Sequence, residues 1–278
     1  MIIRTHIIPG IGAVQLQKLS SQIIQEFLNE LSDSKALSPK TVKNVYGVLH
    51  KALKQAVILH YIKSNPAEGC ELPKVKKPDL TALDDNMIID FLKAIQGHKF
   101  ENVYLIALFT GMRQGEILGL TWDCIDFDTS TITVKQQLQL RRDGSKEYVL
   151  VPTKSGRTRQ ITVSKSVIGI LGIEKNRSTS EFVFTNDNGK PLSATTVYKN
   201  FKRLVSAAGL SSLRFHDLRH GYAVAALRAG DDIKTLQENL GHYSAAFTLD
   251  VYGYVTAQMK QESAVNMEQY ITDLVREK

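Results

Sequence analysis

Cysteine and long apolar runs are the scarcest features of this sequence. It has two cysteines in 278 residues, Cys70 and Cys124, which are too few for a disulfide framework and form no zinc-binding motif. No apolar run approaches the roughly 18 residues of a membrane span, and Arg4, His6 and Pro9 interrupt the apolar start before a signal-peptide core can form. We therefore expect a globular protein of the reducing cytoplasm, without a membrane partner.

Acidic residues are missing from one long segment. Residues 34–67 contain none, although they contain six lysines, and the whole chain has a net charge of +7. A solvated lysine face would explain an isolated patch, whereas an acid-free segment in a basic protein favours a nucleic-acid partner.

The same segment predicts a helix that begins at Pro39, with Ser38 as its N-cap. Its apolar positions recur at helical spacing and form one stripe, made of Val42, Val45, Leu49, Leu53 and Ala56. Another stripe gathers the lysines Lys40, Lys43, Lys51 and Lys54. This pattern suits a helix that packs on one side and lies against DNA phosphates on the other.

Prolines divide the chain into two regions. Pro66, Pro73 and Pro78 lie in a stretch with little periodicity, and a basic cluster of Lys74, Lys76 and Lys77 joins them. We expect a helical DNA-binding domain over residues 1–73, a basic linker over 74–78 and a second domain over 79–278.

The second region mixes helical and strand patterns. "ENVYLIALFTGMRQGEILGL" predicts a core helix interrupted at Gly111, and helices return after Pro191, with stops at Gly230 and Gly241. Between them, "TITVKQ", "EYVLVPT" and "RQITVS" alternate as strands of one small antiparallel sheet. The expected fold class is mainly α with a small antiparallel β-sheet.

Two imidazoles and a guanidinium share one helical turn in "FHDLRHGYAVAALRAG", where His216, Arg219 and His220 follow one another at helical spacing. A helix built only for packing has little use for such a group. Further polar residues stand where packing does not require them: Arg113 and Glu116 in an apolar stretch, Lys154 in the "TKSG" turn, His242 after a glycine, and Tyr252.

A metal centre is one interpretation of these residues. His216 and His220 have the H-x-x-x-H spacing that places two imidazoles on one helix face, and His242 is a candidate third ligand. Against this, Asp217 replaces the glutamate that such a motif needs, and Arg219 would put a positive charge beside the metal ion.

Metal-free phosphoryl transfer is the second interpretation. Two arginines can hold the non-bridging oxygens of a phosphodiester and neutralise the charge of a five-coordinate phosphorus. A tyrosine hydroxyl can attack phosphorus, and a lysine or histidine can protonate the leaving oxygen. Residues for every role are present: Arg113, Lys154, His216, Arg219, His242 and Tyr252. This interpretation needs no metal ion or other cofactor.

Three boxes resemble the tyrosine recombinases, the bacteriophage-integrase family: "TGMRQGEILGLTWDCID", "HDLRHGYAVAALRAG" and "LGHYSAAFTLDVYGYV". Their order matches the family, and the region before residue 73 is similar to its core-DNA-binding domain. The chain begins inside what resembles the first helix of that domain, so we expect a shortened start and no arm-binding domain before it.

The resemblance implies a role for each residue. Tyr252 would form a 3′-phosphotyrosine and release a 5′-hydroxyl, with Tyr254 as the rival nucleophile. Arg113 and Arg219 would hold the phosphate, Lys154 would protonate the 5′-oxygen, His216 would handle the tyrosine proton, and His242 would bond to the phosphate. Glu116 and His220 would support the site.

The implied assembly is a C-shaped clamp on double-stranded DNA, and a homotetramer through an amphipathic C-terminal helix that carries Val265, Met267, Tyr270, Ile271 and Leu274. The implied reaction integrates or excises a mobile element in a bacterial nucleoid, with accessory DNA-bending or directionality factors as possible partners. A chromosome-dimer-resolving recombinase and a metal-dependent hydrolase remain the alternatives, together with a non-catalytic DNA-binding relative and a type IB topoisomerase.

Overall fold

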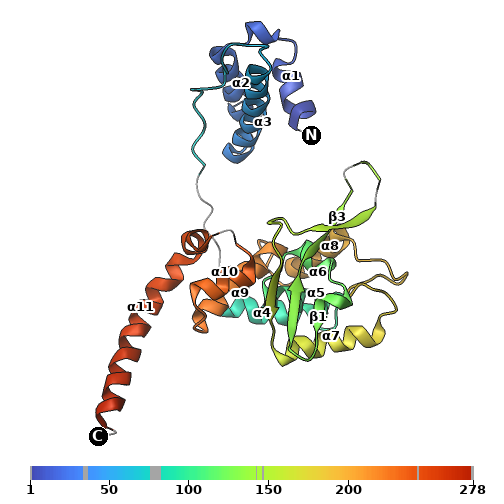
Figure 1. Ribbon diagram of the computed structural model, residues 1–278, viewed down its shortest axis with the longest axis vertical. Coiled ribbons are helices and arrows are strands. Elements are labelled where there is room, and N and C mark those ends of the chain that lie inside the picture. Colours follow the sequence, from blue (N-terminus) through green and yellow to red (C-terminus); the bar gives the residue numbers. More distant parts are fainter. Residues whose placement is uncertain are drawn as a thin grey trace. The chain divides into compact units, whose positions relative to one another are not determined.

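The chain folds into two compact units, Met1–Asp79 and Leu80–Lys278 (Figure 1). Each unit has its own hydrophobic core. The computed structural model describes residues 2–33, 37–75, 83–141, 143–145, 147–242 and 244–276, and only part of the side chains of the last helix. None of the helices in these ranges is long and apolar enough to cross a membrane.

The regular elements described in the first unit are all helices. It comprises η1 (Ile3–Ile7), α1 (Ile8–Ile11), η2 (Leu16–Lys18), α2 (Ser21–Asp33) and α3 (Pro39–Ile58). Helix α3 begins as predicted, because the Ser38 side chain accepts a hydrogen bond from the backbone N–H of Thr41 and Pro39 occupies the first position.

Helix α3 has the two predicted faces. Val42, Val45, Leu49 and Leu53 are buried against α2 and its neighbours, while Ala56 is half-buried. The lysines of the other stripe, Lys40, Lys43, Lys51 and Lys54, are all exposed, as is Lys74. Lys76 and Lys77 lie outside the described residues.

The described residues of the second unit form eight α-helices and the short η3 (Trp122–Cys124). The α-helices are α4 (Asp85–Ile95), α5 (Glu101–Thr110), α6 (Gln114–Leu118), α7 (Lys165–Arg177), α8 (Ala194–Ala207), α9 (Phe215–Arg228), α10 (Ile233–Leu240) and α11 (Ala245–Arg276). Gly111 ends α5 with φ +62°, as the sequence indicates. Helix α7 is not among the predicted elements.

The strands form two small sheets, where the sequence predicted one. β1 (Ile125–Asp126), β2 (Thr131–Val134) and β5 (Arg159–Thr162) form the first sheet, and β3 (Gln136–Leu140) pairs with β4 (Tyr148–Pro152) in the second. All pairings are antiparallel. The run "TITVKQ" is therefore split at Lys135. Alternation marks side-chain faces but not pairing partners, and Pro152, opposite Gln136, has no N–H to extend the ladder.

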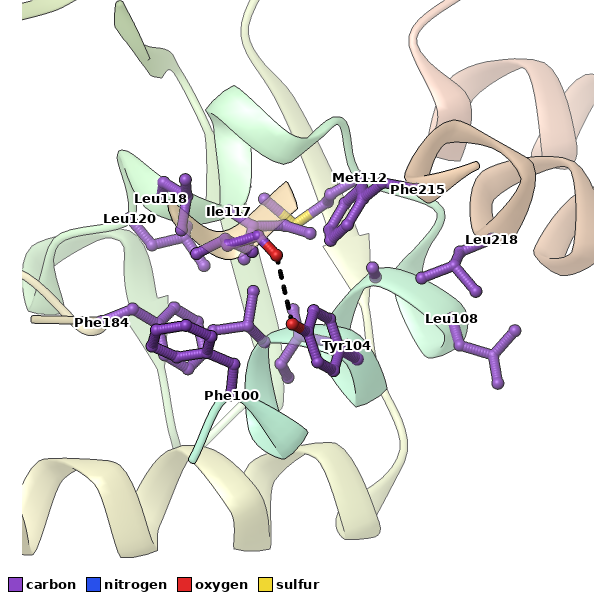
Figure 2. Close-up of a cluster of buried hydrophobic side chains, with 14 of the residues drawn as sticks. Phe100, Tyr104, Leu108, Met112, Ile117, Leu118, Leu120, Phe184, Phe215 and Leu218 are labelled. Carbon is purple, nitrogen blue, oxygen red and sulfur yellow. Dashed lines mark hydrogen bonds between the residues drawn. The ribbon is translucent and has the colours of Figure 1, made fainter. Parts of the chain in front are cut away.

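An apolar and aromatic core fixes α5, α6 and the start of α9 relative to one another (Figure 2). Tyr104 of α5 is fully buried, and its ring centroid lies 6.2 Å from that of Phe215 at the start of α9. Its hydroxyl donates to the Val197 carbonyl at 3.2 Å, the dashed line of Figure 2. This packing matters for function because Arg113 directly precedes α6, and Arg219 lies in the second turn of α9.

Candidate active site

The first predicted arginine, Arg113, is held by Glu116. Arg113 is the N-cap residue of α6. It donates two hydrogen bonds to the Glu116 carboxylate, one from the Arg113 backbone N–H at 2.9 Å and one from the Arg113 guanidinium at 2.8 Å. The Glu116 side chain is fully buried, whereas that of Arg113 keeps about a quarter of its surface exposed, at 27%. Arg113 can therefore still bind an anion while Glu116 orients it.

Arg159 is a residue that the sequence reasoning missed. From β5 it donates to both Glu116 oxygens, at 3.2 and 2.6 Å, and its Nε donates to the Asn239 carbonyl of α10 at 2.8 Å. Burial by itself would raise the pKa of Glu116, but the hydrogen bonds and charges of Arg159 and Arg113 outweigh it and lower this pKa to about 2. An arginine in an alternating strand gives no sign of this contact.

The second predicted arginine, Arg219, is buried beneath the site. Its guanidinium donates to the carbonyls of Gly111 at 2.8 Å and Leu240 at 2.5 Å, which joins the end of α5 to the end of α10. Burial and the positive charge of Arg113 lower the pKa of Arg219 to about 9, which still leaves it cationic at neutral pH. Among the described residues, no acidic side chain forms an ion pair with Arg219, although the buried Glu116 carboxylate interacts with it electrostatically. The positive charges of Arg113 and Arg219 together favour binding of an anion between them.

Tyr252 points into the same cluster. It is 1% exposed in α11, which packs on α9 and α10. Its hydroxyl lies 2.7 Å from Nδ1 of His220, and its phenol interacts electrostatically with Arg219. The side chain of Tyr254, the rival nucleophile, lies outside the described part of the structure.

The two other histidines complete the group. His242 follows Gly241, the left-handed residue that ends α10, and its Nδ1 lies 3.0 Å from the Thr248 hydroxyl. Burial, then Arg219 and Arg113, lower the pKa of His242 to about 3. His216 is exposed, but desolvation by the atoms around it, followed by the charges of His220 and Arg219, lowers the pKa of His216 to about 4. Both rings are therefore neutral at pH 7, and the negative charge of a bound phosphate would raise both pKa values.

Lys154 is the one predicted catalytic residue that no described contact joins to the cluster. It is exposed in the turn after β4, which closes through a hydrogen bond from Gly156 N–H to the Thr153 carbonyl at 2.8 Å. The same loop borders a cavity of about 440 Å³ whose lining includes Ser155, Arg159 and His242. The turn therefore reaches the rim of the site.

The metal interpretation finds no support in the donor geometry. Among the described residues, no three histidine, cysteine, aspartate or glutamate side chains are placed to hold one ion. His216 and His220 meet edge to face, with ring centroids 4.9 Å apart. Asp217 is occupied by the N–H and guanidinium of Arg214, at 2.7 Å in both cases.

Comparison with known families identifies the family of this chain. The profile of the phage integrase family matches residues 80–259, and that of the N-terminal SAM-like domain of phage integrases matches residues 1–32. The first match alone covers more than half of the chain. The protein therefore belongs to the phage integrase family of tyrosine recombinases, and the predicted fold class and recombinase identity are confirmed.

Individual relatives include both integrases and Xer-type proteins. A tyrosine recombinase XerC-like protein of Caldanaerobacter subterraneus subsp. tengcongensis is 27% identical, over 89% of this chain and 70% of its own length. The ICEBs1 integrase of Bacillus subtilis is 25% identical, over 96% of this chain and 75% of its own.

Solved structures share the fold. The Tn1549 transposon integrase bound to transposon right-end DNA is 26% identical, with a TM-score of 0.79 over 94% of this chain and 90% of that one. A lambda integrase tetramer bound to a Holliday junction shares the fold alone, at 21% identity and a TM-score of 0.67 over 88% of this chain and 70% of that one.

Proposed function

We propose that this protein cleaves and rejoins DNA at specific sites through a 3′-phosphotyrosine formed on Tyr252, and so integrates and excises a mobile element. The observation that carries the proposal is the meeting of Arg113, Arg219 and the buried Tyr252 hydroxyl in one cluster, together with three histidines. Such a cluster supplies a nucleophile, anion ligands and proton carriers at the same place.

The arginines bind the scissile phosphate in this proposal. Their charges offset the negative charge that grows on the non-bridging oxygens as the tyrosine oxygen attacks phosphorus. His242, held by Thr248, donates a hydrogen bond to the same phosphate. The phosphotyrosine bond retains the energy of the broken phosphodiester, so rejoining needs neither ATP nor a metal ion.

Lys154 is the proposed acid for the leaving 5′-oxygen. Its exposed turn leaves the ammonium accessible to DNA, and the same loop borders the cavity that His242 lines. We propose that bound DNA brings this turn onto the leaving oxygen, because protonation is what turns a deoxyribose alkoxide into a good leaving group.

Duplex DNA is the proposed partner of both units. The exposed lysines of α3 form a stripe that matches a phosphate backbone, with residues 74–78 as a basic linker between the units. The Tn1549 integrase, similar over nearly the whole chain, was solved on transposon DNA. We propose that each unit contacts the DNA, and that four subunits assemble through α11; a tetramer is the form in which lambda integrase was solved on a Holliday junction.

Covalent trapping tests the proposal. The protein is mixed with DNA that carries candidate element ends and a nick near the cleavage point, in EDTA, and quenched with SDS. We expect a protein–DNA band that Tyr252→Phe abolishes and Tyr254→Phe retains. A band lost only with Tyr254→Phe would move the nucleophile to Tyr254. Cutting that EDTA abolishes would instead support the metal-dependent hydrolase.

A chromosome-dimer-resolving recombinase is the second candidate, because a XerC-like relative matches 89% of this chain. Trapping on element ends, compared with trapping on chromosomal dimer-resolution sites, distinguishes the two. Preference for the chromosomal sites would replace the mobile-element assignment and leave the tyrosine chemistry in place.

A further inference from the structure

The contact between His220 and Tyr252 has no part in the roles assigned so far. The Tyr252 hydroxyl lies 2.7 Å from Nδ1 of His220, with the ring centroids 5.8 Å apart. The family resemblance gives the tyrosine proton to His216. The ring of His216 packs edge to face on that of His220, with the two ring centroids 4.9 Å apart.

We propose that His220 is the general base that takes the Tyr252 proton during DNA cleavage and returns it during rejoining. This inference rests on the recombinase chemistry proposed above. It makes His220 a catalytic residue, because it touches the reacting oxygen.

The Tyr252 oxygen forms a bond to phosphorus while its proton passes to Nδ1 of His220, and the bond from phosphorus to the 5′-oxygen breaks. That oxygen takes a separate proton from the acid, proposed to be Lys154. In rejoining, the 5′-hydroxyl gives its proton to the now neutral amine of Lys154 and attacks phosphorus. The bond from phosphorus to the Tyr252 oxygen breaks, and the protonated His220 returns its proton to that oxygen.

Burial explains why a protein group is needed. Tyr252 is 1% exposed, so its hydroxyl cannot pass a proton directly to bulk water. A tyrosine in water has a pKa of about 10, so an adjacent base speeds its attack at neutral pH. His220 is one residue from Arg219, so the base and the proposed phosphate ligand reach Tyr252 from the same turn of α9.

The surroundings of His220 suit a base that begins neutral. Burial lowers its pKa, the Asp217 carboxylate raises it, and Arg219 and Arg214 lower it further. His216, on the same helix, and His242, after α10, also interact with it. A neutral ring can accept the phenol hydrogen bond at Nδ1, and the Asp217 carboxylate, three residues away on α9, then stabilises the imidazolium.

Single-turnover cleavage of nicked DNA tests the proposal. His220→Asn keeps a hydrogen-bond acceptor near the Nδ1 position but cannot take the proton. We expect it to slow formation of the covalent adduct about 100-fold or more, the usual range for losing a general base. Unchanged DNA affinity and thermal unfolding would show that the variant is folded. A loss of less than about threefold would overturn the proposal.

A substrate whose leaving group needs no protonation distinguishes a base that acts on Tyr252 from an acid that acts on the 5′-oxygen. A 5′-bridging phosphorothiolate leaves without protonation, so it should restore activity to Lys154→Ala but leave the His220→Asn defect unchanged. Recovery of His220→Asn on this substrate would place His220 at the leaving group and contradict the proposal.

Incorporating 3,5-difluorotyrosine at position 252 separates proton transfer from positioning. This phenol is more acidic, so the defect of His220→Asn should shrink by about tenfold, whereas a purely positioning role predicts the same defect with both phenols.

The protein that keeps His220 and carries either tyrosine or 3,5-difluorotyrosine at position 252 gives an independent test if His220→Asn does not fold. With His220 as base, the acidic limb of its pH–rate profile stays in place when the phenol is fluorinated. A limb that moves with the phenol pKa would overturn the proposal.

The two proposals fail in different ways. If the unaltered protein forms no adduct through Tyr252, the recombinase chemistry fails and the His220 role fails with it. If it forms the adduct and His220→Asn forms it as fast, only the role of His220 is overturned.

Discussion

Arg159 donates two hydrogen bonds to the carboxylate of Glu116, 43 positions earlier in the chain, at 3.2 and 2.6 Å. The Glu116 side chain is fully buried and that of Arg159 is 9% exposed. Through its Nε, Arg159 also bonds to the Asn239 carbonyl. One guanidinium therefore connects the strand that follows the Lys154 turn, the carboxylate that orients Arg113, and the helix that precedes His242.

Removing this guanidinium should destabilise the second unit. Arg159→Met leaves the Glu116 carboxylate buried with Arg113 as its remaining partner, and breaking a buried ion pair on one side costs about 3 kcal/mol or more. Urea unfolding followed by the fluorescence of Trp122, the single tryptophan, measures this unit. Lys93→Met, which removes an exposed partner of Asp90, is the control and should cost less than about 1 kcal/mol. If Arg159→Met and Lys93→Met lowered the free energy of unfolding equally, the ion pair of Arg159 with Glu116 would be no more stabilising than an exposed one.

Stability should fall on acidification because of Glu116. Its folded pKa is about 2, below the 4.5 of the free side chain, so its contribution is present above the unfolded pKa and is lost as the pH falls from about 5 towards 2. A shift of this size corresponds to roughly 3 kcal/mol. Urea titrations at several pH values should show a shallower acid loss in Glu116→Gln, which is less stable at neutral pH. Parallel curves for both proteins would show that other groups govern the acid transition.

Gly111 should tolerate no side chain. Its φ is +62°, and an added Cβ would lie 2.4 Å from the Tyr222 ring and 2.8 Å from Leu240. Gly111→Ala therefore combines left-handed strain with overpacking, for about 2–4 kcal/mol. Gly97→Ala is the matched control, because Gly97 has φ +72° and nothing within 4 Å of an added Cβ. It should cost about 1 kcal/mol. Comparable unfolding midpoints for the two variants would refute the steric argument.

The lysine stripe of α3 should set the salt dependence of DNA binding. Replacing Lys40, Lys43, Lys51 and Lys54 by glutamine should weaken binding and reduce the slope of log K against log salt, by about 0.9 for each lysine that contacts a phosphate. Fluorescence anisotropy with labelled duplex at several salt concentrations measures this slope. Lys18→Gln, exposed in the same unit but outside the stripe, should leave it unchanged. An unaltered slope in the fourfold variant would place the DNA elsewhere.

The apolar side chains of α11 should control assembly on DNA. Ile271 is 51% exposed, and Val265, Met267, Tyr270 and Leu274 are also exposed. Ile271→Asp should therefore leave the stability of the second unit within about 0.5 kcal/mol but prevent complexes larger than one subunit per site. Sedimentation velocity on two-site DNA measures the assembly, with Gln269→Asp as a charge-matched control. A destabilised second unit would indicate that α11 packs on its own domain instead.

The sequence by itself determined the features that depend on near neighbours in the chain. The Ser38 cap, the glycine that ends α5 and the two faces of α3 follow from helical spacing and backbone chemistry, which act over a few residues. The same spacing places His216, Arg219 and His220 together on α9. The order of the arginine, histidine and tyrosine boxes was enough to indicate the family.

Only the tertiary structure decided which distant groups meet. In the sequence Arg159 is an ordinary strand residue, and only the fold brings its guanidinium to Glu116 of α6. The pairing of His220 with Tyr252 likewise spans 32 positions between two helices. The division of the strands into two sheets is likewise a matter of partners, which alternation cannot reveal. Such contacts depend on how whole elements pack, because hydrogen bonds and ion pairs form wherever the core places their groups, whatever their separation in sequence.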